Sequence, residues 1–166
     1  MKGSLEVITF TTIGLVALAI GALLIIGSPN SPKGVTSIRR DDLILELAID
    51  KSEVRSGEII TSIIKLTNVG YEVITLETGL PIFDLLLYDD SGRIVSRWSD
   101  GRAFIMILRV IELTPDQSYE EEIEWDLSRY DPQVGSYSPC QPGEYFISVL
   151  LRVKDIETVG VSIIVR

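Results

Sequence analysis

The chain has 166 residues, of which 46% are hydrophobic, and a formal net charge of −9. This length and apolar content allow one domain with a full core plus an appendage, but not two domains. Residues 1–40 carry four basic and one acidic side chain, whereas residues 41–166 carry 11 basic and 23 acidic ones. Because so acidic a domain repels phosphate backbones and shows no basic stripe, we exclude nucleic acid as a partner.

The sequence contains no histidine, so it lacks the commonest general base and zinc ligand, and a Ser-His-Asp or Cys-His catalyst cannot be built. No Gly-rich phosphate loop or metal-ligand cluster is present either, so we expect no enzyme, no cofactor and no metal. Cys140 is the single cysteine. It excludes an internal disulfide, and its place in a long loop favours an exposed, inert thiol. Few Asn, Gln and Cys beside many Ile, Val and Glu are typical of a thermophile.

The first recognisable element is an apolar stretch near the N-terminus. From Val7 to Ile26 there are 20 residues without a charge, which as a helix would match the hydrocarbon thickness of a bilayer, about 30 Å. We therefore predict that residues 1–27 are a single-pass membrane anchor or an uncleaved signal. The alternatives are a cleaved signal, which would have a shorter apolar region and small residues at its exit, and a prepilin-like leader.

Residues 28–40 have the Pro, Gly and Ser content of an extended linker, so we expect the folded domain at residues 41–166. Three basic residues in this linker favour a cytoplasmic domain by the positive-inside rule. However, two Asp residues adjoin them, and large domains cross membranes despite such charges. Analogy with other anchored sandwiches favours the extracytoplasmic side, and both orientations stay open from the sequence.

From Leu43 the hydrophobic period becomes two, which predicts a strand with one core-facing side. That side consists of Leu43, Leu45, Leu47 and Ile49. Ser52–Gly57 is predicted to be a turn. Glu58–Thr67 is apolar on both sides, because Ile59 and Ile63 alternate with the other apolar residues, and this favours a central strand or one covered on both faces. Glu72–Glu77 is interpreted as a short edge strand.

A hairpin follows. The apolar segments Phe83–Tyr88 and Ile94–Trp98 flank Asp89–Gly92, whose Asp, Ser and Gly residues tolerate turn dihedrals. A second break at Ser99–Gly101 leads into Ala103–Ile111, where strong β formers predict a third strand.

The C-terminal part continues the strand pattern. Tyr119–Trp125 alternates core residues with a row of carboxylates that are about 7 Å apart and point in parallel, which favours a solvated or electrostatic contact face over a calcium site. The row is Glu120, Glu122, Glu124 and Asp126. Ser128–Gln141 is the longest loop, and strands are predicted at Tyr145–Val153 and Val159–Val165. About eight or nine strands without a helical pattern after residue 40 predict an all-β, antiparallel β-sandwich.

The most distinctive segment surrounds a tryptophan. Its residues are Arg97, Trp98, Ser99, Asp100, Gly101 and Arg102, followed by Phe104. An exposed Trp between arginines is the combination favoured at binding hot spots. The structural interpretation instead buries Trp98 in the sandwich with Phe104 and lets Arg97 cover it. Both hold if the turn at this strand end is a recognition loop.

Four segments resemble, in the right order, the intracellular proteinase inhibitor (BsuPI-type) domain family. They are Tyr88–Phe104, Leu113–Asp116, Glu124–Asp126 and Pro142–Tyr145. The likeness covers roughly Glu58 to Val153. It implies an immunoglobulin-like β-sandwich of about eight strands, here preceded by the predicted transmembrane helix.

The resemblance also implies a function. A β-sandwich inhibits a protease by presenting a rigid loop to the active-site cleft, where preorganisation lowers the entropy cost of binding. The candidate loops are Ser99–Arg102 and Ser128–Gln141. We therefore expect a membrane-anchored module that binds a protein, a serine protease if the family's activity is kept. The alternative is a surface, filament or envelope subunit without inhibitory activity, whose strands pair with neighbours.

Overall fold

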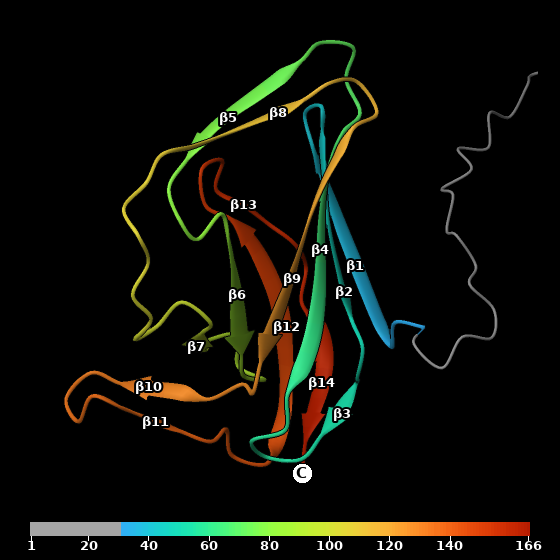
Figure 1. Ribbon diagram of the computed structural model, residues 1–166. Helices are drawn as coiled ribbons and strands as arrows, with labels where there is room; N and C mark the ends of the chain where they lie inside the picture. Colours follow the sequence, from blue (N-terminus) through green and yellow to red (C-terminus); the bar gives the residue numbers. More distant parts are fainter. Residues whose placement is uncertain (1–30) are drawn as a thin grey trace, which may run out of the picture.

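Two β-sheets face each other in the computed structural model, which describes residues 31–166 (Figure 1). The predicted membrane anchor at residues 7–26 lies outside the described residues. Between residues 31 and 166 there is no helix long and apolar enough to span a bilayer. The described chain folds as fourteen strands, several of only two or three residues, which is why the sequence predicted fewer.

The first sheet is antiparallel throughout and has the strand order β1-β2-β4-β9. Its strands are β1 (Gly34–Arg40), β2 (Leu43–Ile49), β4 (Ile60–Asn68) and β9 (Ser118–Trp125). The strict alternation of buried and half-exposed residues along β2 confirms the predicted core-facing side.

The second sheet has the order β3-β14-β12-β6-β7, and a short sixth strand, β13, pairs with β12. Its strands are β3 (Glu53–Val54), β6 (Phe83–Tyr88), β7 (Ile94–Arg97), β12 (Gly143–Leu151), β13 (Ile156–Glu157) and β14 (Val161–Val165). Strand β3 runs parallel to β14, and the other pairs are antiparallel. The predicted hairpin of β6 and β7 is confirmed.

Two further ribbons extend from this sandwich. Strands β5 (Ile74–Thr78) and β8 (Arg109–Leu113) pair at one end, and β10 (Arg129–Asp131) and β11 (Ser136–Ser138) pair near the other end (Figure 1). The second ribbon occupies the segment that the sequence predicted as the longest loop.

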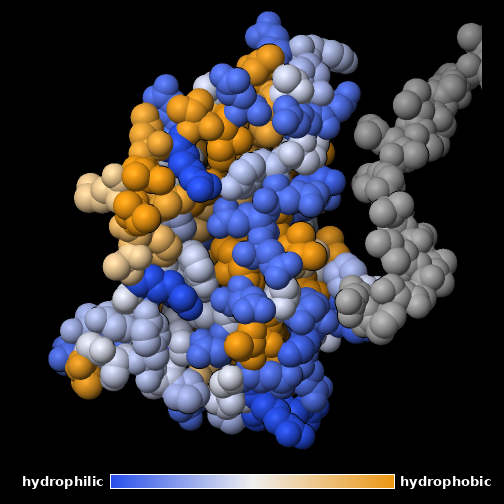
Figure 2. Space-filling model, viewed as in Figure 1, coloured by the Kyte–Doolittle hydropathy of each residue, from blue (hydrophilic) through white to orange (hydrophobic). Residues whose placement is uncertain are grey.

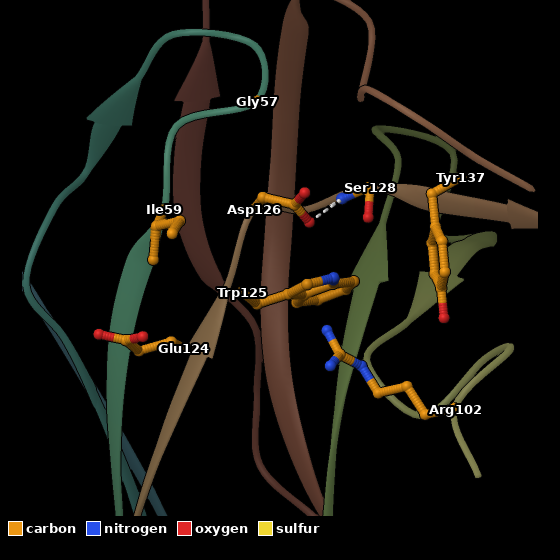
Figure 3. Close-up of a pocket in the computed structure, with 8 residues that line it drawn as sticks. All are labelled: Gly57, Ile59, Arg102, Glu124, Trp125, Asp126, Ser128 and Tyr137. Atoms are coloured by element: carbon orange, nitrogen blue, oxygen red, sulfur yellow. Dashed lines mark hydrogen bonds between the residues drawn. The ribbon is translucent and has the colours of Figure 1, made fainter.

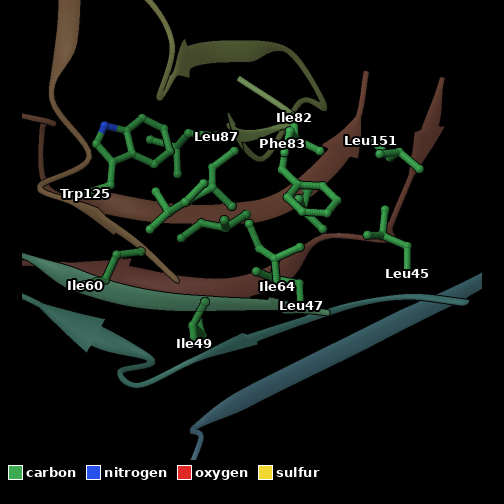
Figure 4. Packing of buried hydrophobic residues seen from close by; sticks show 14 of the residues in the cluster. Leu45, Leu47, Ile49, Ile60, Ile64, Ile82, Phe83, Leu87, Trp125 and Leu151 are labelled. Atoms are coloured by element: carbon green, nitrogen blue, oxygen red, sulfur yellow. The ribbon is translucent and has the colours of Figure 1, made fainter. Parts of the chain in front are cut away.

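The core fills the space between the two main sheets. Leu47 and Ile64 of one sheet point toward Phe83 of the other, and all three are fully buried (Figure 4). Burying a side chain of this size stabilises the fold by about 1.5–3 kcal/mol. Leu86 on β6 is also buried, because β6 is covered on both faces.

The structure corrects the predicted linker at residues 28–40. Residues Gly34–Arg40 form β1, which pairs along its whole length with β2 after a tight turn at Asp41, where φ is +53°. Half-buried and exposed residues alternate along most of β1, but its hydrophobic pattern is weak because it is an edge strand: Val35 is exposed and Ile38 packs against the core. The sandwich therefore begins inside the segment predicted to be a linker.

Other predictions were wrong in detail. The strand expected at Ala103–Ile111 begins only at Arg109. Strand β4 is central in its sheet, which confirms one of the two alternatives, and the exposed Ile63 on its outer face excludes the other, a strand covered on both faces. The turn expected at Ser52–Gly57 contains the short strand β3. Cys140 was expected to be exposed, but it is buried because its loop folds back onto the core.

Candidate functional site

The turn that follows β7 is built by its own polar groups. Asp100 N–H donates to the Arg97 carbonyl at 3.2 Å, and Arg102 N–H donates to the Ser99 carbonyl at 3.2 Å. Arg97 N–H donates in turn to the Asp100 carboxylate at 3.2 Å. Gly101 takes a φ of +71°, which glycine adopts without steric cost. The predicted break at Ser99–Gly101 is thus a hydrogen-bonded turn.

A buried carboxylate fastens this turn to the sheet. Asp84 on β6 accepts hydrogen bonds from the Ser99 backbone N–H at 3.0 Å and from the Ser99 hydroxyl at 2.6 Å. Burial raises the pKa of this carboxyl, and the two bonds from Ser99 oppose the shift. Trp98 N–H also donates to the Leu85 carbonyl at 2.9 Å. Two consecutive residues, Trp98 and Ser99, are therefore hydrogen-bonded to β6.

Trp98 is half-buried against the core and bridges the two sheets. Its indole N–H donates to the Glu124 carbonyl on β9 at 3.2 Å. The Phe104 ring packs on the indole with centroids 5.7 Å apart, as the structural interpretation of the sequence expected. The covering cation, however, is Arg102 and not Arg97: the Arg102 guanidinium lies 4.8 Å from the centre of the indole, a cation–π geometry.

The β10–β11 ribbon packs against the same turn. The Tyr137 hydroxyl donates to the Asp100 carbonyl at 2.9 Å. The Tyr130 ring lies 5.1 Å from the Tyr137 ring and closely against Gly101, where an added Cβ would come within 2.4 Å of it. The two loops that the sequence singled out are therefore joined. We call them together the loop platform, meaning the Ser99–Arg102 turn and the β10–β11 ribbon.

An open pocket of about 440 Å³ lies beside the loop platform (Figure 3). Arg102 and Tyr137 stand on one side, Ile59 and Glu124 on the other, and Trp125 lies between them. Gly57, Asp126 and Ser128 complete the lining. The mixture of aromatic, apolar and oppositely charged side chains is typical of a surface that recognises another protein.

The structure places the predicted residues as follows. Six of them form the end of β7 and the turn, and the seventh packs beside it: Arg97, Trp98, Ser99, Asp100, Gly101, Arg102 and Phe104. Sequence reasoning missed Asp84, Tyr130 and Tyr137. The signal for the two tyrosines was present, because the turn-forming Pro132 and Gly135 lie between them and favour a ribbon.

The predicted carboxylate row lies on β9, where Glu120, Glu122 and Glu124 are the members within the strand. Lys65 on the neighbouring β4 pairs with Glu120 at 3.6 Å. In residues 31–166, no three potential metal ligands come together as a group that could hold an ion. Glu124 connects the row to the pocket.

In a comparison with known families, the model of the intracellular proteinase inhibitor family, BsuPI, matches residues 47–156. This range contains every residue of the loop platform. No curated protein matches the chain.

Solved structures give weak similarities. A β-glucosidase from Erythrobacter marinus has 14% identity and a TM-score of 0.46, over 72% of this chain and 15% of that one. The alkylpurine DNA glycosylase AlkC from Pseudomonas fluorescens has 15% identity and a TM-score of 0.47, over 75% and 30%. The CARDB domain of the PF1109 protein from Pyrococcus furiosus has 16% identity and a TM-score of 0.39, over 75% and 88%. The chain thus spans 15% of the length of the β-glucosidase.

Proposed function

This chain belongs to the intracellular proteinase inhibitor (BsuPI) family, and we propose that it is a protein-binding β-sandwich that inhibits a serine protease through its loop platform. The family match supports inhibition as the activity. The observation that supports the loop platform as its site is the contact between two loops distant in sequence, made by the Tyr137 hydroxyl and the Asp100 carbonyl. A loop fixed in this way loses little conformational entropy on binding.

The test is a titration of the full chain into serine proteases while residual protease activity is followed. Saturable inhibition with the chain left intact is the expected result. Arg102→Glu, which reverses the charge beside the pocket, should weaken inhibition about tenfold, the usual effect of losing a contact worth about 1.4 kcal/mol. The matched control is Lys154→Glu, because Lys154 is exposed between β12 and β13 and lines a pocket with Arg40 and Ile156 that contains no residue of the loop platform. If every protease keeps its full activity when the chain is present in molar excess, the proposal is overturned.

A structural subunit without inhibitory activity is the second candidate. It is favoured by β1, which within the described residues has no strand on its outer side and could pair with a neighbouring chain. Stable filaments formed by the purified full-length chain, together with an absence of inhibition, would favour this function over the first.

We also propose that residues 7–26 anchor the protein in a membrane and that the domain lies on the extracytoplasmic side. The 20 uncharged residues from Val7 to Ile26 support the anchor. The absence of histidine from the sequence supports a protein that is not an enzyme. The residue composition supports a thermophilic source.

A further inference from the structure

Four consecutive apolar side chains, Ile105 to Leu108, lie on the surface directly after the loop platform. Met106 is fully exposed, and Ile105 and Leu108 are 73% and 70% exposed. Figure 2 shows a hydrophobic surface on the side of the molecule where Figure 1 draws the segment between β7 and β8. Soluble proteins rarely leave so continuous an apolar surface in water unless it binds something.

The backbone of residues 103–108 is available for pairing. Among the residues that the structure describes, its one backbone hydrogen bond joins Ile107 N–H to the Ile105 carbonyl at 3.0 Å. A bond between residues two apart makes a three-residue turn and places Met106 at its tip. The remaining N–H and C=O groups are of the kind that a protease cleft pairs with when it binds a peptide strand.

Both ends of this segment are held. At the start, the Arg102 side chain donates from Nε to the Trp98 carbonyl at 2.7 Å, and Phe104 packs on the Trp98 ring. At the end, β8 pairs with β5 from Arg109 onward. Fixed ends limit the number of conformations of the four apolar residues, which lowers the entropy lost when a partner binds them.

We propose that Ile105–Leu108 is the segment that this chain inserts into the active-site cleft of a serine protease, with Met106 in an apolar primary pocket. This inference rests on the proposed function, and it extends the inhibitory contact from the loop platform to the segment that directly follows it. A long apolar side chain fits the hydrophobic slot of a chymotrypsin-like pocket and not the Asp-containing pocket of trypsin. The exposed Arg102 and Arg109 flank the segment on an otherwise acidic domain, so a cleft with an acidic rim approaches this surface with favourable charge.

The experiment measures inhibition constants of the full chain against chymotrypsin and trypsin, two proteases that differ in the primary pocket. The unmodified chain should inhibit chymotrypsin and leave trypsin active. Met106→Asp should weaken the inhibition of chymotrypsin at least ~100-fold, because a charge would enter an apolar pocket. Met106→Lys should transfer inhibition to trypsin. Amide hydrogens of residues 105–108 should exchange more slowly in the chymotrypsin complex.

Val159→Asp is the matched control, since Val159 is 72% exposed, apolar and outside the segment; it should inhibit like the parent. Thermal unfolding of each variant verifies that the fold is kept.

If chymotrypsin is inhibited equally by Met106→Asp and the parent, the assignment of this segment is wrong while protease inhibition stands. If the parent inhibits only trypsin, the placement of Met106 in an apolar primary pocket is wrong. If it inhibits neither protease, the inference is wrong, and the titration into other serine proteases decides separately whether the proposed inhibition fails.

Discussion

Gly101 is the residue on which the geometry of the loop platform depends most directly. Its φ is +71°, and a Cβ would lie 2.4 Å from the Tyr130 ring. We expect Gly101→Ala to lower the free energy of unfolding by about 2–4 kcal/mol, since left-handed strain and a clash add. Urea unfolding measures the loss. Gly92→Ala is the control: Gly92 has a φ of +76°, but a Cβ added there would have no atom within 4 Å, so only strain of about 1–2 kcal/mol is expected. Equal losses in the two variants would contradict the packing argument.

Asp84 gives a prediction about pH. Because burial raises its pKa in the folded state above the ordinary value of 3.8, the native protein binds this proton more tightly than the unfolded chain. Its contribution therefore favours folding at low pH and is lost as pH rises through the folded-state pKa. Asp84→Asn cannot ionise, and its amide can still bond to Ser99.

We expect the free energy of unfolding of Asp84→Asn, relative to the parent, to rise as pH increases above 3.8 and then to level off. Denaturant unfolding at a series of pH values measures this difference. The control is Asp90→Asn, which removes an exposed carboxylate from the β6–β7 turn. A difference for Asp84→Asn that stays flat from about pH 3 to 7, or falls, would refute the sign.

At the scale of elements, β1 tests where the domain begins. A chain that starts at Asp41 lacks β1 and exposes the paired edge of β2. We expect its free energy of unfolding to be about 2 kcal/mol lower than that of a chain that starts at Ser31, because the burial of Ile38 and the pairing of β1 with β2 are both lost. It should also associate, since an uncovered strand edge recruits other chains. Chemical unfolding and light scattering measure both effects, and equal stability of the two chains would restore the linker interpretation.

The sequence predicted the strands whose own side chains define two faces. In β2 and β9, alternation alone separates core from solvent, and the structure follows it. The turn of the β6–β7 hairpin was equally clear, because Asp89 accepts hydrogen bonds from the backbone N–H groups of Ser91 and Arg93. In these elements the determining interactions are local, so they can be inferred from the sequence.

The failures occur where a partner distant in sequence decides the structure. The sequence of β1 has a weak hydrophobic pattern, and the segment forms a strand because it pairs with β2. Ala103–Leu108 has strong β formers but no neighbouring strand among the described residues, so propensity is overridden. The candidate site divides in the same way: the turn at Ser99–Arg102 was predicted, whereas the buried partner Asp84 and the contact of Tyr137 with Asp100 depend on the folded topology.

For the whole molecule, the proposed membrane anchoring and extracytoplasmic location of the domain can be tested with a thiol label. Cys140 is buried and burial raises the pKa of its thiol, so the parent should react slowly. Val134→Cys adds a thiol at a position that is 73% exposed between β10 and β11. We expect a membrane-impermeant maleimide to label this variant in intact cells, and the parent chain to stay unlabelled. Labelling only after lysis would place the domain in the cytoplasm.

The position of β14 has a consequence for biosynthesis. Among the described strands it is the last to be made, yet it lies between β3 and β12 in the second sheet. Glu53 of β3 pairs with Ile164 of β14. Until the ribosome has synthesised β14, β3 therefore lacks its partner strand in the second sheet. Loop closure over so long a separation is slow. The nascent domain should therefore stay incompletely folded until synthesis reaches β14, a state in which an unfolded chain can be threaded through a translocation channel.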